Sequence, residues 1–106
     1  MRNGNTYFRN SKTFKSLYIT WRDMKDMCNN KNNNRYRFYG GKGIKVCDEW
    51  QEFKNFLFSA IRLGWQTGLT IDRIDSNLDY CESNCQWLTR KENSKKRWKD
   101  KVVCVK

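Results

Sequence analysis

Near the start of the chain, apolar residues recur at the spacing of one helical face. The residues that share this face are Leu17, Trp21, Met24 and Cys28, and charged residues fall between them. A stripe with this period predicts an amphipathic helix over about residues 15–28, with the stripe buried in a core. Residues 1–14 are polar and basic and predict a flexible arm, which is either a disordered terminus or a segment that reaches along a nucleic-acid groove.

Turn-forming residues punctuate the middle of the chain. Residues 29–34 consist of Asn and Lys and predict a loop. Residues 40–43 (Gly-Gly-Lys-Gly) predict a tight turn, in which Lys42 is a candidate phosphate contact. This turn is not a nucleotide-binding P-loop, because the required Lys-Ser/Thr pair is missing. Residues 44–46 (Ile-Lys-Val) alternate like a short strand.

A second helix is predicted over about residues 48–63 by its apolar spacing and by both of its ends. Asp48 and Gln51 fit a capping box at its start. Gly64 fits a C-terminal stop. The predicted buried face comprises Trp50, Phe53, Leu57, Ala60 and Ile61.

The last third of the chain predicts a hairpin followed by a helix. Residues 69–74 read as a strand, residues 75–77 (Asp-Ser-Asn) as a turn, and residues 85–88 as the returning strand, which we expect to bury Trp87. Thr89 and Glu92 then form a capping box that opens a helix through about residue 98.

These elements predict an α+β fold with one small domain over residues 15–101 and a tail over residues 102–106. The domain would consist of a strand–loop–strand–helix (ββα) unit preceded by two helices and a short strand. At 106 residues, the chain has room for one modest core.

The net positive charge of the chain indicates what kind of partner it binds. The chain has 22 Lys and Arg against 11 Asp and Glu, a formal net charge of +11, and a sequence pI of about 9.7. Such an excess in a small domain is typical of a polyanion binder, although a basic surface also serves solubility alone. No apolar run approaches the ~20 residues that span a bilayer, and no secretory leader is evident. We therefore expect an intracellular protein without a membrane partner.

The five cysteines do not fit a disulfide framework, because their number is odd. Four of them are candidates for a structural zinc site of four thiolates: Cys28, Cys47, Cys81 and Cys85. The chain has no CxxC pair, and buried free thiols are the alternative.

The candidate chemistry lies on the predicted ββα unit. Asp72 on the first strand offers a carboxylate, and Asn93 on the helix offers an amide oxygen. Mg²⁺ prefers oxygen ligands, and one or two protein groups together with waters and phosphate oxygens suffice to hold it. Asn84, in the loop, is placed to orient the first ligand. These residues predict a divalent-metal site for phosphodiester cleavage, with Mg²⁺ or Mn²⁺ as the metal.

Six ordered motifs carry a resemblance to a known family: Trp21-x-x-Met24, Tyr39-Gly-Gly-x-Gly-Ile44, Trp50-x-x-Phe53, Asp72-Arg-Ile-Asp75, Asn84-Cys-x-Trp87 and Asn93. The chain resembles the HNH family of ββα-metal nucleases, in particular the phage-type HNH-like proteins of homing-endonuclease ancestry. The resemblance implies an endonuclease of double-stranded DNA, encoded by a phage in a bacterial host. It makes Asp72 and Asn93 the metal ligands and Asn84 the loop-orienting residue.

The chain departs from the family at one catalytic position. The family's first histidine, which activates the attacking water, falls on Arg73, and the chain contains no histidine. Arginine stays protonated and is a very poor base, but it can bind the scissile phosphate and stabilise charge. The base would then be Asp75, Tyr80 or a metal-bound hydroxide.

Several cations are candidate DNA contacts: Lys42, Arg73, Arg90, Lys91, Lys95, Lys96 and Arg97. The leading hypothesis is a small metal-dependent DNA endonuclease. The alternative is a catalytically inactive DNA-binding protein on the same scaffold, with a regulatory or inhibitory role. A module that binds an acidic protein is a third class, which the charge alone permits.

Overall fold

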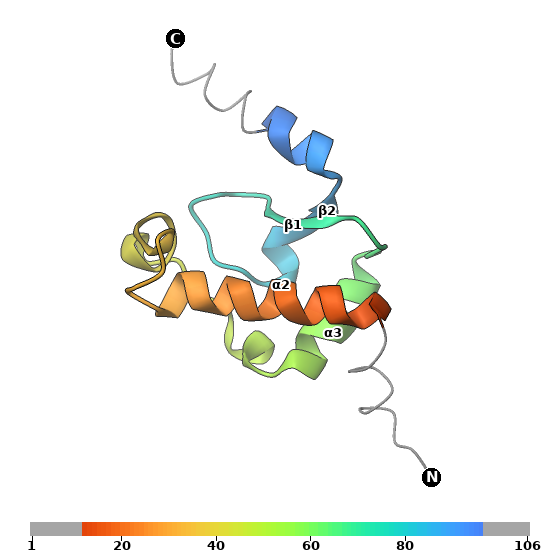
Figure 1. Cartoon of the computed structure of the whole chain (residues 1–106), viewed down its shortest axis with the longest axis horizontal. Helices are drawn as coiled ribbons and strands as arrows, with labels where there is room; N and C mark the ends of the chain where they lie inside the picture. Colours follow the sequence, from red (N-terminus) through yellow and green to blue (C-terminus); the bar gives the residue numbers. More distant parts are fainter. Residues whose placement is uncertain (1–11, 97–106) are drawn as a thin grey trace.

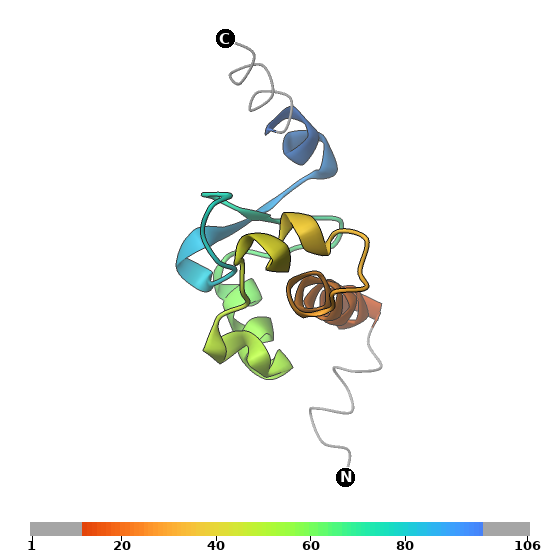
Figure 2. The same ribbon diagram turned by 90° about the vertical axis from the view of Figure 1, so that its left-hand side faces the viewer.

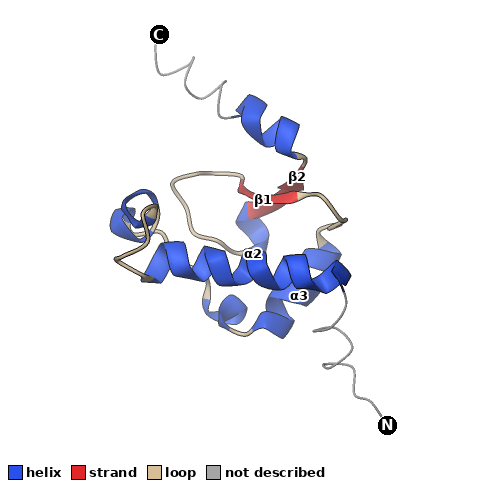
Figure 3. Cartoon of the chain, viewed as in Figure 1, coloured by secondary structure: helices blue, strands red, loops and turns tan. Residues whose placement is uncertain are grey.

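The helices and the hairpin occupy different sides of the molecule, as the computed structural model of the chain shows; it describes residues 12–96. The long helix α2 (Lys12–Asn29) lies beside the shorter helix α3 (Phe53–Arg62). The strands β1 (Thr70–Arg73) and β2 (Cys85–Leu88) pair above them, and residues 90–96 form a further helix (Figures 1 and 3). This arrangement confirms the α+β class and the ββα-like end.

Four 3-10 turns connect these elements: η1 (Tyr36–Phe38), η2 (Gly40–Lys42), η3 (Asp48–Gln51) and η4 (Glu82–Asn84). The short strand predicted at residues 44–46 is reduced to a single parallel bridge between Val46 and Tyr80. In a view turned by 90°, the helix of residues 90–96 stands at the end of the hairpin that faces away from α2 (Figure 2). None of the helices in residues 12–96 is long and apolar enough to cross a membrane.

Helix α2 begins three residues earlier than the sequence predicts, so residues 12–14 belong to the helix and not to the arm. Residues 1–11 of the predicted arm lie outside the described part of the chain, as does the tail. The predicted apolar stripe is confirmed: Leu17, Met24 and Cys28 are buried, and Trp21 packs against the core at its edge.

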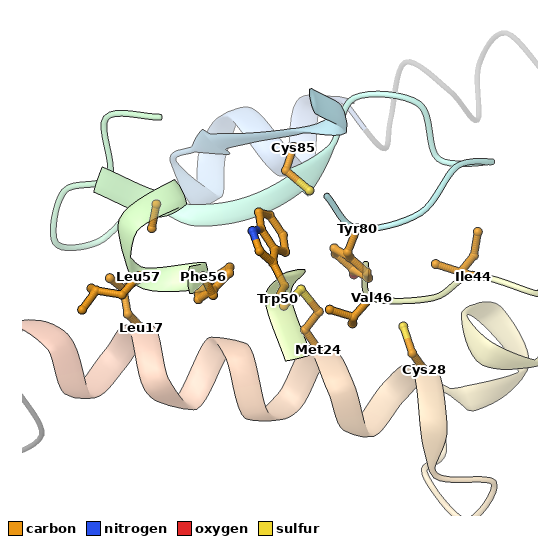
Figure 4. Packing of buried hydrophobic residues seen from close by; sticks show 11 residues of the cluster. Leu17, Met24, Cys28, Ile44, Val46, Trp50, Phe56, Leu57, Tyr80 and Cys85 are labelled. Atoms are coloured by element: carbon orange, nitrogen blue, oxygen red, sulfur yellow. The ribbon is translucent and has the colours of Figure 1, made fainter. Parts of the chain in front are cut away.

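Aromatic rings fill the centre of the core (Figure 4). Trp50 and Phe56 are almost fully buried and meet edge to face, with ring centroids 4.9 Å apart. The indole N–H of Trp50 donates to Ser59 Oγ at 2.9 Å, so this polar atom is satisfied inside the core. Burying each such side chain contributes roughly 1.5–3 kcal/mol, which makes this cluster the main support of a small domain.

The single helix predicted over residues 48–63 is wrong. The chain forms η3, breaks at Glu52, whose ψ of 131° is extended, and only then begins α3. Cys47, and not Asp48, is the N-cap residue of η3, and Gln51 Nε2 donates to the carbonyl oxygen of Val46 at 3.0 Å. Of the predicted buried face, Trp50, Leu57 and Ala60 are buried, Phe53 is partly buried and Ile61 is 52% exposed.

The C-terminal stop of α3 is confirmed at Gly64, which has a φ of +85°. Gly64 N–H donates to the carbonyl oxygen of Ile61 at 3.0 Å, and Trp65 N–H donates to that of Ala60 at 3.0 Å. This pair of bonds is the Schellman motif, in which the residue after the helix adopts the left-handed conformation that glycine tolerates.

The predicted hairpin and the start of the helix that follows it are also confirmed, and the predicted end of that helix near residue 98 lies outside the described residues. The strands are antiparallel, and Asp72 lies opposite Gln86 in their register. Thr89 and Glu92 form the predicted capping box: Glu92 N–H donates to Thr89 Oγ1 at 3.0 Å, and Thr89 N–H donates to Glu92 Oε1 at 2.8 Å. Trp87 packs against the core as expected.

The glycine-rich turn is present, and packing explains one of its glycines. A Cβ on Gly40 would lie 2.1 Å from the carbonyl oxygen of Cys28, so only glycine lets η2 pack this closely against the end of α2. Lys42 is exposed on this turn. Tyr39 is the residue before η2, and its ring stacks on that of Tyr80, with ring centroids 6.1 Å apart.

Candidate functional site: a cleft at the hairpin and the following helix

A cleft of about 190 Å³ lies where β1 meets the helix of residues 90–96. We call it the hairpin cleft, and it is lined by Tyr39, Ile71, Asp72, Arg73, Ser76, Tyr80, Asn93 and Lys96. It brings together four of the predicted site residues, Asp72, Arg73, Asn93 and Lys96, and the candidate base Tyr80. Asn84 does not line the cleft, and Tyr39 reaches it from a distant part of the chain.

Asp72 is the carboxylate of the hairpin cleft, and its side chain is only 11% exposed. Its Oδ2 accepts hydrogen bonds from Gln86 Nε2 at 3.0 Å and from Lys96 Nζ at 2.6 Å. Its Oδ1 accepts none from residues 12–96. Asp72 therefore pairs with Lys96, and not with Arg73 or Arg90, and keeps one oxygen for a further ligand.

Lys96 lies deeper in the site than its assignment as a DNA contact implies. Its Nζ donates to Asp72 Oδ2 and also to the backbone carbonyl oxygens of Arg73 at 2.8 Å and Ile74 at 3.3 Å. The sequence contains a signal for this placement: residues three positions apart share one face of a helix, so Lys96 follows Asn93 toward the cleft.

Asn93 is held in one orientation by the first strand. Its Nδ2 donates to Thr70 Oγ1 at 2.8 Å, and the Thr70 hydroxyl donates in turn to the carbonyl oxygen of Leu88 at 3.0 Å. Because the amide nitrogen is engaged, the amide oxygen of Asn93 is the atom left for a ligand, and no donor among residues 12–96 reaches it.

Arg73 forms part of the wall of the cleft. Its Nη1 donates to the carbonyl oxygens of Ser76 and Leu78, the latter at 3.0 Å. Its guanidinium carbon lies 5.2 Å from the centre of the Tyr39 ring and 5.1 Å from that of Tyr80. Hydrogen bonds and cation–π contacts thus fix Arg73 between the loop and the two rings, where it adds positive charge to the site.

Neither side chain considered as a base is well placed for that role. Burial raises the pKa of the Tyr80 phenol, so this hydroxyl keeps its proton at neutral pH. Asp75 is exposed and does not line the cleft, and its Oδ1 accepts the backbone N–H of Asn77 at 2.9 Å. This bond makes Asp75 a turn residue, which agrees with the alternative interpretation of its sequence.

Asn84 fixes the loop between the strands, as the sequence predicts. It is 8% exposed, and its Oδ1 accepts the N–H of Asp75 at 3.0 Å. Its Nδ2 donates to the carbonyl oxygens of Asp75 at 3.1 Å and Asp79 at 3.0 Å. One buried amide thus joins the two ends of the loop that follows Asp72 and Arg73.

The remaining predicted DNA contacts are exposed and lie outside the cleft: Lys42, Arg90, Lys91 and Lys95. None of these four forms an ion pair within residues 12–96. Their charges are therefore open to an anionic partner. Arg97, with the neighbouring Trp98, lies outside the described residues.

The cysteines are not gathered into the predicted zinc site. Within residues 12–96, no group of three or more Cys, Asp or Glu side chains is placed to hold a metal. Cys28 lies at the end of α2 and Cys85 on β2, at separate places of the core (Figure 4). Burial raises the pKa of Cys28 to about 11 and that of Cys85 to about 12, which keeps both thiols protonated. Cys47 and Cys81 are half-buried free thiols.

Comparison with protein-family models, with characterised proteins and with solved structures found no match to this chain.

Proposed function

We propose that this protein binds double-stranded DNA and cleaves it as a small HNH-like endonuclease, with the hairpin cleft as its active site. The observation that supports this most is the pair of open oxygens in the cleft: Asp72 Oδ1 and Asn93 Oδ1, which no donor within residues 12–96 reaches. They lie on a ββα-like end in a protein with a net charge of +11.

The oxygens of Asp72 and Asn93 fit a divalent metal in donor type, because Mg²⁺ and Mn²⁺ prefer carboxylate and amide oxygens. A metal held there would neutralise charge on a scissile phosphate and on its leaving oxygen. Arg73 would add a fixed positive charge beside that phosphate. The exposed cations outside the cleft would hold flanking phosphates.

Cleavage by this site is expected to be slow. Asp72 is the only carboxylate among residues 12–96 that lines the cleft, and it is assigned to the metal. Arg73 and Lys96 are cations, and the Tyr80 phenol keeps its proton. A positioned general base typically contributes about 10²–10⁴ in rate, and that contribution is absent when none of the lining side chains can accept a proton.

The alternative is a DNA-binding protein that does not cleave, with a regulatory or inhibitory role. A specific observation favours it: the position of the catalytic base holds Arg73, whose Nη1 already bonds two loop carbonyls. In this case the cleft would be a phosphate-binding surface, and Asp72 would serve to position Lys96.

Incubation of the purified protein with supercoiled plasmid separates the two functions. The endonuclease proposal expects slow conversion to nicked or linear DNA with Mg²⁺ or Mn²⁺ and none with excess chelator. If the wild-type protein fails to nick under all of these metals but still binds duplex DNA, the enzyme proposal is wrong and the binding protein remains.

DNA binding itself is tested by the salt dependence of the affinity for a labelled duplex. Each phosphate neutralised by a cation contributes about −0.9 to the slope of log K against log salt concentration. We expect Lys91→Met and Lys95→Met each to reduce the steepness by up to this amount, while Lys54→Met on the exposed face of α3 leaves it unchanged. A shallow slope for the wild type would contradict DNA binding in either form.

A further inference from the structure

We infer that the ammonium group of Lys96 acts as a built-in cation of the hairpin cleft and competes with a divalent metal for Asp72. The inference deepens the proposed function, since it concerns the metal site of the same cleft. It is carried by three oxygens that converge on one nitrogen: Asp72 Oδ2 at 2.6 Å, and the carbonyl oxygens of Arg73 at 2.8 Å and Ile74 at 3.3 Å.

These oxygens are the kinds of ligand that bind hard cations. Carboxylates and backbone carbonyls coordinate Ca²⁺ and Mg²⁺ in proteins. An ammonium group has three N–H donors and no acceptor, so three oxygens satisfy it completely. Lys96 thus places a fixed single positive charge at Asp72 Oδ2.

The local fold explains why Lys96 reaches this position. The capping box of Thr89 and Glu92 fixes where the helix begins. One face of that helix then lies along β1, with Asn93 bonded to Thr70 and Lys96 bonded to Asp72. The neighbouring Lys95 is exposed and does not line the cleft, so the placement belongs to one helical face and not to the basic run as a whole.

The positive charge of Lys96 opposes the binding of a metal ion in the cleft. Among residues 12–96, the cleft is lined by one carboxylate and by two cations, Arg73 and Lys96, so this part of the chain gives it excess positive charge. A divalent ion beside Asp72 would share that carboxylate with the Lys96 ammonium, and like charges repel in a partly buried site. The Lys96 ammonium therefore weakens the binding of a metal at Asp72.

Titration calorimetry with Mn²⁺ alone tests this inference on the full chain. Lys96→Met removes the charge and keeps an unbranched apolar side chain. We expect it to bind Mn²⁺ about 10–100-fold more tightly than the wild type, the scale on which groups beside a metal ligand alter metal affinity. Lys54→Met removes one exposed positive charge outside the cleft and should leave the affinity unchanged.

A second variant controls for the possibility that Lys96→Met does not fold. Lys96→Gln keeps a hydrogen-bond donor without the charge and should also bind Mn²⁺ more tightly, and circular dichroism reports whether each variant is folded. Equal Mn²⁺ affinity in the wild type and in the folded Lys96 variants would overturn the inference, as would an equal gain in Lys54→Met.

The outcomes of the two proposals are distinguishable. Tighter Mn²⁺ binding by Lys96→Met without any plasmid cleavage would support this inference and contradict the endonuclease. Unchanged Mn²⁺ affinity with plasmid cleavage would support the endonuclease and contradict the role of Lys96.

Discussion

Within residues 12–96, two ion pairs join positions far apart in the sequence, and they differ in how many carboxylate oxygens they use. Lys96 pairs with Asp72 across 24 positions at the hairpin cleft, and Arg62 pairs with Glu82 across 20 positions between α3 and η4. The side chains of the first pair are 30% and 11% exposed, and those of the second are 60% and 40% exposed.

In the second pair, both oxygens of the carboxylate are used. Glu82 Oε1 accepts from Ser59 Oγ and from Arg62 Nη2, both at 2.8 Å, and Oε2 accepts from Arg62 Nε at 3.2 Å. Asp72 uses only Oδ2, and its Oδ1 faces no donor within residues 12–96. The comparison indicates that Glu82 joins α3 to η4, whereas Asp72 keeps one carboxylate oxygen for a further ligand.

The largest expected difference between the two carboxylates is in metal affinity. Asp72→Asn should weaken Mn²⁺ binding by at least about 100-fold, because replacing a direct ligand costs no less than altering the groups around it. Glu82→Gln should leave the affinity unchanged, as its oxygens are already saturated. Calorimetric titration of both variants checks this, and equal losses would show that the metal binds elsewhere.

The next largest effect is on stability and concerns η4, the turn that contains both Glu82 and Asn84. Asn84, at the end of this turn, makes three hydrogen bonds to the loop beside the cleft. Asn84→Ala removes these three partly buried hydrogen bonds and should lower the free energy of unfolding by about 2 kcal/mol. Asn77→Ala is the matched control, since the Asn77 side chain is exposed and makes no hydrogen bond within residues 12–96. Urea denaturation of both variants measures the difference, and equal stability would contradict the role of Asn84.

The smallest effect is the pH dependence that comes from Glu82. Hydrogen bonds from Arg62 and then from Ser59 lower the pKa of this carboxyl below its ordinary value of 4.5. A lowered pKa in the folded state adds stability above pH 4.5, and this stability is lost as the pH falls through the folded pKa. Because the pair is exposed, the contribution is small.

Denaturation of the wild type and Glu82→Gln across this range tests the direction. The wild type should be slightly more stable at neutral pH, and the difference should shrink at pH values below 4.5. A difference that grows on acidification would contradict the assignment.

Local signals in the sequence predicted the ββα-like end well. The capping box at Thr89, the stop at Gly64 and the alternation in the strands each depend on neighbouring residues, and the structure confirms each of them. The positions of Asp72 and Asn93 followed from these elements, so their meeting in one cleft was also predictable.

Features that depend on distant contacts were not predictable. The pattern at Asp48 and Gln51 is a complete local signal for a helix start, yet the carbonyl oxygen of Trp50 accepts the indole N–H of Trp21 at 2.6 Å and the chain breaks at Glu52. The placement of Arg73 between Tyr39 and Tyr80 likewise depends on the packing of η2 against α2. Such contacts have no signature in the spacing of residues along the chain.

The most direct test of the central claim compares the two carboxylates in one plasmid-nicking assay. Wild type, Asp72→Asn and Glu82→Gln would be incubated with supercoiled DNA and Mg²⁺ or Mn²⁺, after circular dichroism has shown that each is folded. The account predicts that the wild type and Glu82→Gln nick at similar rates and that Asp72→Asn does not nick. Nicking by Asp72→Asn at the wild-type rate, or its loss in the folded Glu82→Gln variant alone, would contradict it.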